Sequence, residues 1–207
     1  MSEKLKAEQI LCVFASIFTH YGTKFADLNH TGFNSSTPLN KTKERFIMKR
    51  KNGVRFTVQA AAIAALYVVL TFVASALGLS SGVIQLRLSE ALCVLPVFFP
   101  AAVPGLFVGC IIANFLTGSI FIDVIFGSLA TLIGAIGTRL LKKHKILCLA
   151  PPILSNTLII PFVLAFAYNF DGSLFYFMLT VGLGELLSCG ALGYFLGSAL
   201  KKRGNMM

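Results

Sequence analysis

The chain has 207 residues, of which 56% are hydrophobic and only 13% are charged. A soluble globular protein carries about 45–50% apolar and about 25% charged residues, so this composition excludes that class and indicates an integral membrane protein. The formal net charge is +10, but the basic residues gather near the chain ends and in one internal cluster. Because no basic face is interleaved with aromatic residues, we expect no nucleic-acid partner.

Residues 1–47 differ in character from the rest of the chain. They are rich in charge, and their longest apolar run, Ile10–Phe18, is too short to cross a bilayer. The run Lys43-Glu44-Arg45, just before Met48, can be encoded by a bacterial ribosome-binding sequence. We therefore predict that 1–47 is a translated leader and that 48–207 is the membrane domain. The alternative is a genuine cytoplasmic or interfacial arm, and the nucleotides of codons 43–45 distinguish the two.

The apolar stretches after Val54 predict six membrane helices. Phe56–Leu86 supplies the first, and the block Gly78–Thr138 is long enough for three crossings of about 30 Å each. Three prolines at four-residue spacing (96, 100 and 104) break this block, since proline interrupts a continuous helix. The expected spans after the first are Ser89–Phe99, Pro104–Leu116, Phe121–Leu141, Ile146–Phe170 and Gly172–Leu200.

The positions of the basic clusters favour the same number of helices. They lie at Lys49–Arg55, Arg139–Lys145 and Lys201–Arg203. Basic loops favour the cytoplasm, so an even number of spans should separate neighbouring clusters. We therefore predict an all-α integral membrane protein, a six-helix transmembrane bundle with both termini in the cytoplasm. The alternative is a four-span protein with a re-entrant hairpin around Pro96–Gly105, because both short helices are marginal in length.

The sequence contains none of the motifs that would indicate an enzyme. It has no Gly-x-x-x-x-Gly-Lys-Ser/Thr loop for ATP, and its five cysteines show neither Cys-x-x-Cys nor zinc spacing. An intramembrane enzyme would need a paired nucleophile and base or clustered metal ligands, and the sequence indicates neither. We therefore expect no catalytic activity, no metal and no cofactor.

Ionisable residues within the predicted spans indicate a ligand site, because charge at membrane depth is costly. Glu185 should lie near the bilayer middle, with no basic residue expected at its depth. Arg87 and Glu90 should lie at the outer end of the second helix and Asp123 near the outer end of the fourth, while Asn156 adds an amide on the fifth. We expect these five residues to bind substrate. The alternatives are an Arg87–Glu90 salt bridge at i,i+3 spacing and Asp123 as a helix N-terminal charge.

Four sequence blocks together resemble a known family. They are Gln85–Leu92 (QLRLSEAL), Pro104–Cys110 (PGLFVGC), Asp123–Leu132 (DVIFGSLATL) and Val181–Glu185 (VGLGE). In this order they resemble the QueT family, the substrate-binding S components of energy-coupling-factor (ECF) transporters. The resemblance covers about residues 54–200.

The resemblance implies the fold, the cargo and the partners. It implies a six-helix bundle of ECF S-component type in a bacterial cell membrane, with a site open to the outside. The implied cargo is a queuosine precursor, namely a 7-deazaguanine base such as 7-aminomethyl-7-deazaguanine, 7-cyano-7-deazaguanine or queuine. A transmembrane scaffold subunit and two ATPase subunits would be separate chains. A small-residue surface on the first helix would meet the scaffold, which corresponds here to Ala60, Ala61, Ala64 and Ala65.

The acidic residues suit such a cargo. One carboxylate can accept hydrogen bonds from the adjacent N–H and NH2 groups of a guanine-type edge, and a cationic aminomethyl group favours a second acid. The sequence leaves open which acid has which role. The alternative cargo is another small vitamin or nucleobase.

Overall fold

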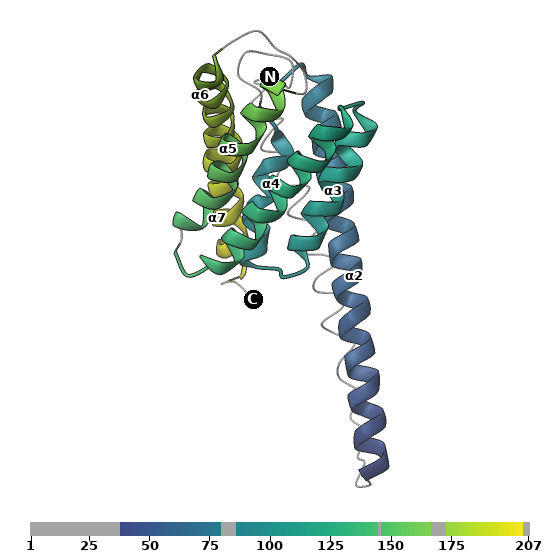
Figure 1. The fold of residues 1–207 in the computed structure, drawn as a ribbon. Coiled ribbons are helices and arrows are strands. Elements are labelled where there is room, and N and C mark those ends of the chain that lie inside the picture. Colours follow the sequence, from purple (N-terminus) through teal and green to yellow (C-terminus); the bar gives the residue numbers. More distant parts are fainter. Residues whose placement is uncertain (1–37, 80–85, 145, 167–172, 205–207) are drawn as a thin grey trace. The chain divides into compact units, whose positions relative to one another are not determined.

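The computed structural model describes residues 38–79, 86–144, 146–166 and 173–204 (Figure 1). Over these ranges the chain forms helices, turns and bends but no strand. The chain divides into a larger unit, Gly53–Gly197, and a smaller one that comprises Met1–Asn52 and Ser198–Met207. The described part of the smaller unit is helical. All the candidate site residues lie in the larger unit.

Nine helical segments follow one another in the described ranges. They are α2 (Pro38–Ala76), the 3-10 helix η2 (Leu88–Val97), α3 (Ala102–Leu116), α4 (Phe121–Leu140), the 3-10 turn η3 (Leu147–Leu149), α5 (Ala150–Phe166), α6 (Leu174–Glu185), the π-helical segment η4 (Leu186–Leu192) and α7 (Gly193–Gly204). The segments α6, η4 and α7 follow each other without a break. The predicted boundary between residues 47 and 48 falls inside α2, and the domain division at that point stays a prediction.

The protein is a multi-pass membrane protein. Four helical stretches are long and apolar enough to cross a membrane, and two shorter apolar helices, η2 and α3, lie between the first and the second of them. The four long stretches are Gly53–Ala76, Phe121–Leu140, Leu147–Phe166 and Leu174–Lys202. The six predicted helical segments are therefore confirmed as helices. Six crossings with cytoplasmic termini stay a prediction, and so does the four-span alternative.

The prolines shape the two short helices. Pro96 lies inside η2 near its end, and Pro104 lies in the first turn of α3, where the backbone N–H groups have no intrahelical partner. Arg139, in the last turn of α4, donates from Nη1 to the carbonyl of Pro96 at 2.9 Å. This hydrogen bond holds the C-terminal end of η2 against α4.

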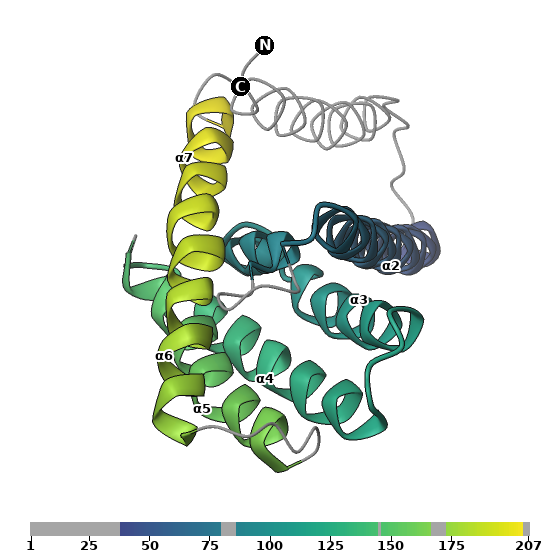
Figure 2. The same ribbon diagram turned by 90° about the horizontal axis from the view of Figure 1, so that it is seen from above.

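Two glycines allow α3 to pack directly on α2. A Cβ at Gly105 would lie 2.7 Å from the carbonyl oxygen of Ala60, and a Cβ at Gly109 would lie 2.9 Å from Tyr67 Cβ and 3.0 Å from Ala64 Cα. Real Cβ atoms do not approach backbone that closely, so only glycine fits at both positions. Figure 2 shows α3 between α2 and α4. Small residues of this kind are typical of tightly packed membrane helices.

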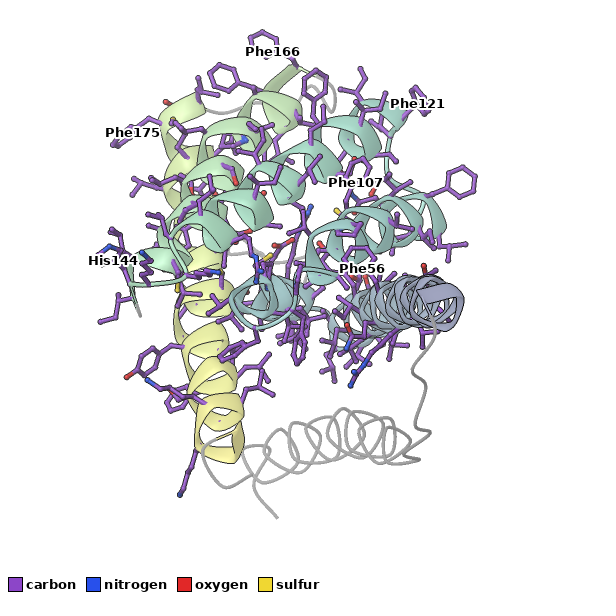
Figure 3. The ribbon with its side chains drawn as sticks, turned by 90° about the horizontal axis from the view of Figure 1, so that it is seen from below. Phe56, Phe107, Phe121, His144, Phe166 and Phe175 are labelled. Atoms are coloured by element: carbon purple, nitrogen blue, oxygen red, sulfur yellow. The ribbon has the colours of Figure 1, made fainter. Side chains whose placement is uncertain are left out.

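Polar side chains lie inside the larger unit and large apolar ones lie on its outside. The buried polar side chains include three carboxylates and two amides, namely Glu90, Asp123, Glu185, Asn114 and Asn156. The exposed apolar side chains include Phe121, Phe166 and Phe175, which point away from the helices in Figure 3. A protein whose outer surface meets lipid has no need of a polar exterior, so this distribution agrees with a membrane environment.

The 3-10 helix η2 occupies the interior of the larger unit. It contacts α3, α4, η3 and η4. Seven of its ten residues are buried, among them Glu90, which is fully inaccessible to solvent. The N-terminal half of η2 therefore places an acid between the membrane helices.

Candidate substrate-binding site

Glu90 is held by hydrogen bonds at both of its carboxylate oxygens. The hydroxyl of Tyr67, on α2, donates to Oε1 at 2.6 Å. The thiol of Cys93, one turn further along η2, donates to Oε2 at 3.1 Å. Tyr67 and Cys93 are themselves buried. The carboxylate of Glu90 is thus fixed in position by protein groups on two elements.

Glu185 is satisfied at only one of its oxygens. It is the last residue of α6 and only 5% exposed. Asn156, on α5, donates from Nδ2 to Oε1 at 2.9 Å. The second oxygen, Oε2, is buried and has no hydrogen-bond partner in the described part of the chain. A buried carboxylate oxygen without a donor is costly, which makes it the strongest sign of a bound polar ligand.

Arg87 lies within electrostatic reach of all three acids. It directly precedes η2 and is partly buried, and its guanidinium interacts electrostatically with Asp123, Glu90 and Glu185. The carboxylates of Glu90 and Glu185 also interact with each other. The absence of a basic residue at the membrane depth of Glu185 stays a prediction. Arg87 nevertheless lies within electrostatic reach of Glu185, because η2 is buried among the helices.

Asp123 lies beside a second amide. It is in the first turn of α4 and 5% exposed. At this position its negative charge interacts favourably with the helix dipole. A Cβ at Gly127 would lie 3.5 Å from Asp123 Oδ1 and 3.1 Å from Asn114 Nδ2. Gly127 thus leaves room for both polar groups at the α3–α4 interface.

The structure brings all five sequence-predicted site residues into one interior cluster. Arg87, Glu90, Asp123 and Glu185 are joined by electrostatic interactions, and Asn156 is joined to Glu185 by its hydrogen bond. Sequence reasoning missed three further members, Tyr67, Cys93 and Asn114. No local pattern could have found Tyr67, because its link to Glu90 joins residues 23 positions apart.

The four alanines of the expected partner surface divide between two faces of α2. Ala60 and Ala64 face Gly105 and Gly109 of α3, so that pair is used within the chain. Ala61 and Ala65 are exposed.

Comparison with known proteins agrees with the resemblance carried by the four sequence blocks. The profile of the QueT transporter family matches residues 57–202, which include every residue of the cluster. This protein belongs to the QueT transporter family. The resemblance seen in the four sequence blocks is thereby confirmed.

A curated relative in the same family is the queuosine precursor transporter QueT of Lactococcus lactis subsp. cremoris (strain MG1363). This chain is 38% identical to it over 89 residues, which are 42% of this chain and 52% of the relative. The match thus spans about half the length of that QueT protein. No solved structure matches this chain.

Proposed function

We propose that this QueT protein is the substrate-binding membrane subunit of an ECF transporter that imports a queuosine precursor with a 7-deazaguanine base. The proposal is supported by family membership and by the relative in Lactococcus lactis, which is named as a queuosine precursor transporter. It is also supported by the chemistry of the buried cluster, where carboxylates and amides converge among apolar helices. The binding residues of the proposal are Glu185, Asp123, Glu90, Arg87 and Asn156.

The observation that carries the proposal is the unpartnered oxygen of Glu185. Because Oε2 is buried and no described residue donates to it, a ligand that offers adjacent N–H groups would stabilise it. A guanine-type edge presents a ring N–H beside an exocyclic NH2, and one carboxylate can accept from both. Asn156 fixes the orientation of the carboxylate through Oε1. Glu185 is therefore the proposed reader of the base, while Glu90 is occupied by Tyr67 and Cys93.

The charge balance of the cluster supports a ligand with a cationic substituent. Three buried carboxylates interact with one guanidinium, that of Arg87. If all four groups are ionised, negative charge is in excess, and buried charges need compensation. An aminomethyl group, positively charged at neutral pH, supplies it. Among the precursors, this favours 7-aminomethyl-7-deazaguanine over its neutral 7-cyano relative.

Calorimetry on purified protein tests the binding site. We expect Glu185→Gln to weaken binding of 7-aminomethyl-7-deazaguanine by about tenfold to a hundredfold, since the amide turns one acceptor into a donor that faces a donor. The matching base without its 2-amino group should lose less on the same substitution, because it offers Glu185 one donor fewer. Equal affinities of wild type and Glu185→Gln would remove Glu185 from the site. Mass spectrometry of the ligand that co-purifies in detergent identifies the natural cargo.

Coupling to a scaffold subunit and two ATPase subunits is the second part of the proposal. The chain has no phosphate loop of its own, so ATP hydrolysis would come from other chains. The exposed alanines Ala61 and Ala65 offer a smooth surface for a scaffold helix. We expect Ala61→Leu to reduce uptake by the assembled transporter while the isolated protein still binds ligand. Binding that fails together with uptake would show that Ala61 supports the fold instead.

A further inference from the structure

Hydroxyl side chains in the helices of this protein usually donate to their own backbone. Ser128 donates to the carbonyl of Ile125 at 2.9 Å, and Thr131 donates to that of Gly127 at 3.0 Å. Thr57, Thr71, Thr117 and Thr180 do the same with carbonyls three or four residues earlier. This local bond is the ordinary way in which a helical Ser or Thr satisfies its hydroxyl inside a membrane protein.

Ser188 departs from that behaviour. It is 1% exposed, and its hydroxyl oxygen is buried with no hydrogen-bond partner in the described residues. It lies in the π-helical segment η4, which begins directly after Glu185. The wider π-helical turn changes how side chains meet the preceding carbonyls, and such segments occur often at functional sites. The hydroxyl is therefore left available at the interior face of the helix.

Unpartnered buried oxygens occur on Glu185 itself and on the two segments that contact its helix, α5 and η4. Within the described chain, four buried side-chain oxygens have no partner, and three of them are on α5, α6 or η4: Thr157 Oγ1, Glu185 Oε2 and Ser188 Oγ. Thr157 directly follows Asn156, and its Oγ1 would lie 3.5 Å from a Cβ at Gly182. Gly182 lies one helical turn before Glu185. Glu185 and Ser188 are both on the buried side of one helix.

We propose that Ser188 is a specificity-determining residue that donates its hydroxyl hydrogen to the 6-oxo group of the base bound by Glu185. This inference rests on the proposed function and deepens it. On a guanine-type edge the 6-oxo group, the ring N–H and the 2-amino group stand in a row, as acceptor, donor and donor. A carboxylate opposite the two donors and a hydroxyl opposite the acceptor complement that row. We place both groups along one edge of the ring because Glu185 and Ser188 are buried in the same helix, three positions apart.

The pair would give the site a selectivity that the carboxylate alone cannot supply. Glu185 selects for the ring N–H and the amino group. It does not discriminate between bases that differ only in the atom attached at position 6. A hydroxyl that is left without an acceptor in a buried site costs free energy, so a base with a poorer acceptor there is rejected. Ser188 would therefore favour 6-oxo bases over analogues that carry a weak acceptor at the same position.

Binding measurements with two probes test the inference. The probes are 7-aminomethyl-7-deazaguanine and its 6-thio analogue, which keeps the ring N–H and the amino group but has a weaker acceptor. We expect wild type to prefer the 6-oxo base. Ser188→Ala should weaken binding of the 6-oxo base by about threefold to tenfold, the loss expected for one hydrogen bond between neutral groups. It should weaken binding of the thio analogue less, so that the ratio of the affinities for the 6-oxo and 6-thio bases becomes smaller.

The control variant is Ser128→Ala, which removes an equally buried serine whose hydroxyl is bonded to its own helix. It should keep both affinities and the wild-type preference. If Ser188→Ala does not yield folded protein, Ser188→Cys keeps the size and provides only a weak donor, and the same narrowing is expected. An unchanged preference in the folded Ser188 variant would overturn the inference and leave the proposed function standing. Failure of wild type to bind the 6-oxo base would instead overturn the proposed function.

Discussion

The hydrogen bond between Tyr67 and Glu90 should be measurable as a loss of stability when the Tyr67 hydroxyl is removed. Tyr67→Phe deletes one oxygen from a side chain that is 2% exposed and leaves Oε1 of a fully buried carboxylate without its 2.6 Å donor. A hydrogen bond to a charged group contributes about 1.5–3 kcal/mol to stability. Because Oε1 of Glu90 is buried, no water molecule replaces the lost donor and the oxygen stays unsatisfied. We therefore expect the free energy of unfolding to fall by about 1.5–3 kcal/mol.

Thermal unfolding of the detergent-solubilised protein measures this change. For a chain of this size the expected loss corresponds to a decrease in Tm of about 3–12 °C. Tyr194→Phe is the matched control, because Tyr194 is 50% exposed and removal of its hydroxyl should change stability by less than about 0.5 kcal/mol.

A double-mutant cycle isolates the Tyr67–Glu90 interaction. In the Glu90→Gln background the carboxylate charge is absent, so Tyr67→Phe should cost clearly less than it does in wild type. If Tyr67→Phe leaves Tm within the range of the Tyr194→Phe control, the hydrogen bond contributes nothing to stability. An equal cost in both backgrounds would also refute the reasoning, since it would show that the contribution of the Tyr67 hydroxyl does not depend on the charge of Glu90.

Two further predictions concern helix packing and orientation. Gly134→Ala should destabilise the protein, because the new Cβ would lie 2.6 Å from Pro152 Cα on α5. Gly53→Ala is the control and should not destabilise it, since nothing lies within 4 Å of a Cβ at that position. Unfolding temperatures of the two variants test this, and equal values would contradict it. Cysteine labelling in intact cells should place Lys143 in the cytoplasm and Asp171, which is outside the described residues, on the outer side; a cytoplasmic Asp171 would overturn the six-span prediction.

The long elements could be predicted because their signals are local. Uniform apolar runs bounded by charge give the long helices, and Pro96 and Pro104 mark the short hairpin because proline restricts the backbone at its own position. The π-helical segment η4 could not be predicted, since Leu186–Leu192 contains no proline or charged residue, and its Ser188 and Gly190 also occur in ordinary membrane helices. Its geometry depends on how the whole helix packs.

The candidate site was predictable in its acids and not in their partners. Glu185 is conspicuous in the sequence because a carboxylate within an apolar stretch is energetically costly and therefore indicates a function. Which oxygen of it is satisfied depends on Asn156, 29 residues away. In the same way, the alanines of α2 could be recognised as a small-residue surface, but an apolar helix has no polar face to orient it. Only the position of α3 shows that Ala60 and Ala64 lie against its glycines while Ala61 and Ala65 remain exposed.

The glycine contacts between α2 and α3 have a mechanical consequence. With Gly105 and Gly109 seated on the backbone of Ala60 and Ala64, neither a lipid chain nor a water molecule fits between the two helices at these points. Tilting α2 toward α3 would push backbone into backbone, so α3 must move with α2 in that direction. Because α3 also carries Asn114, which lies close to Gly127, any force applied to the outer side of α2 reaches the polar interior through α3 without needing a flexible joint.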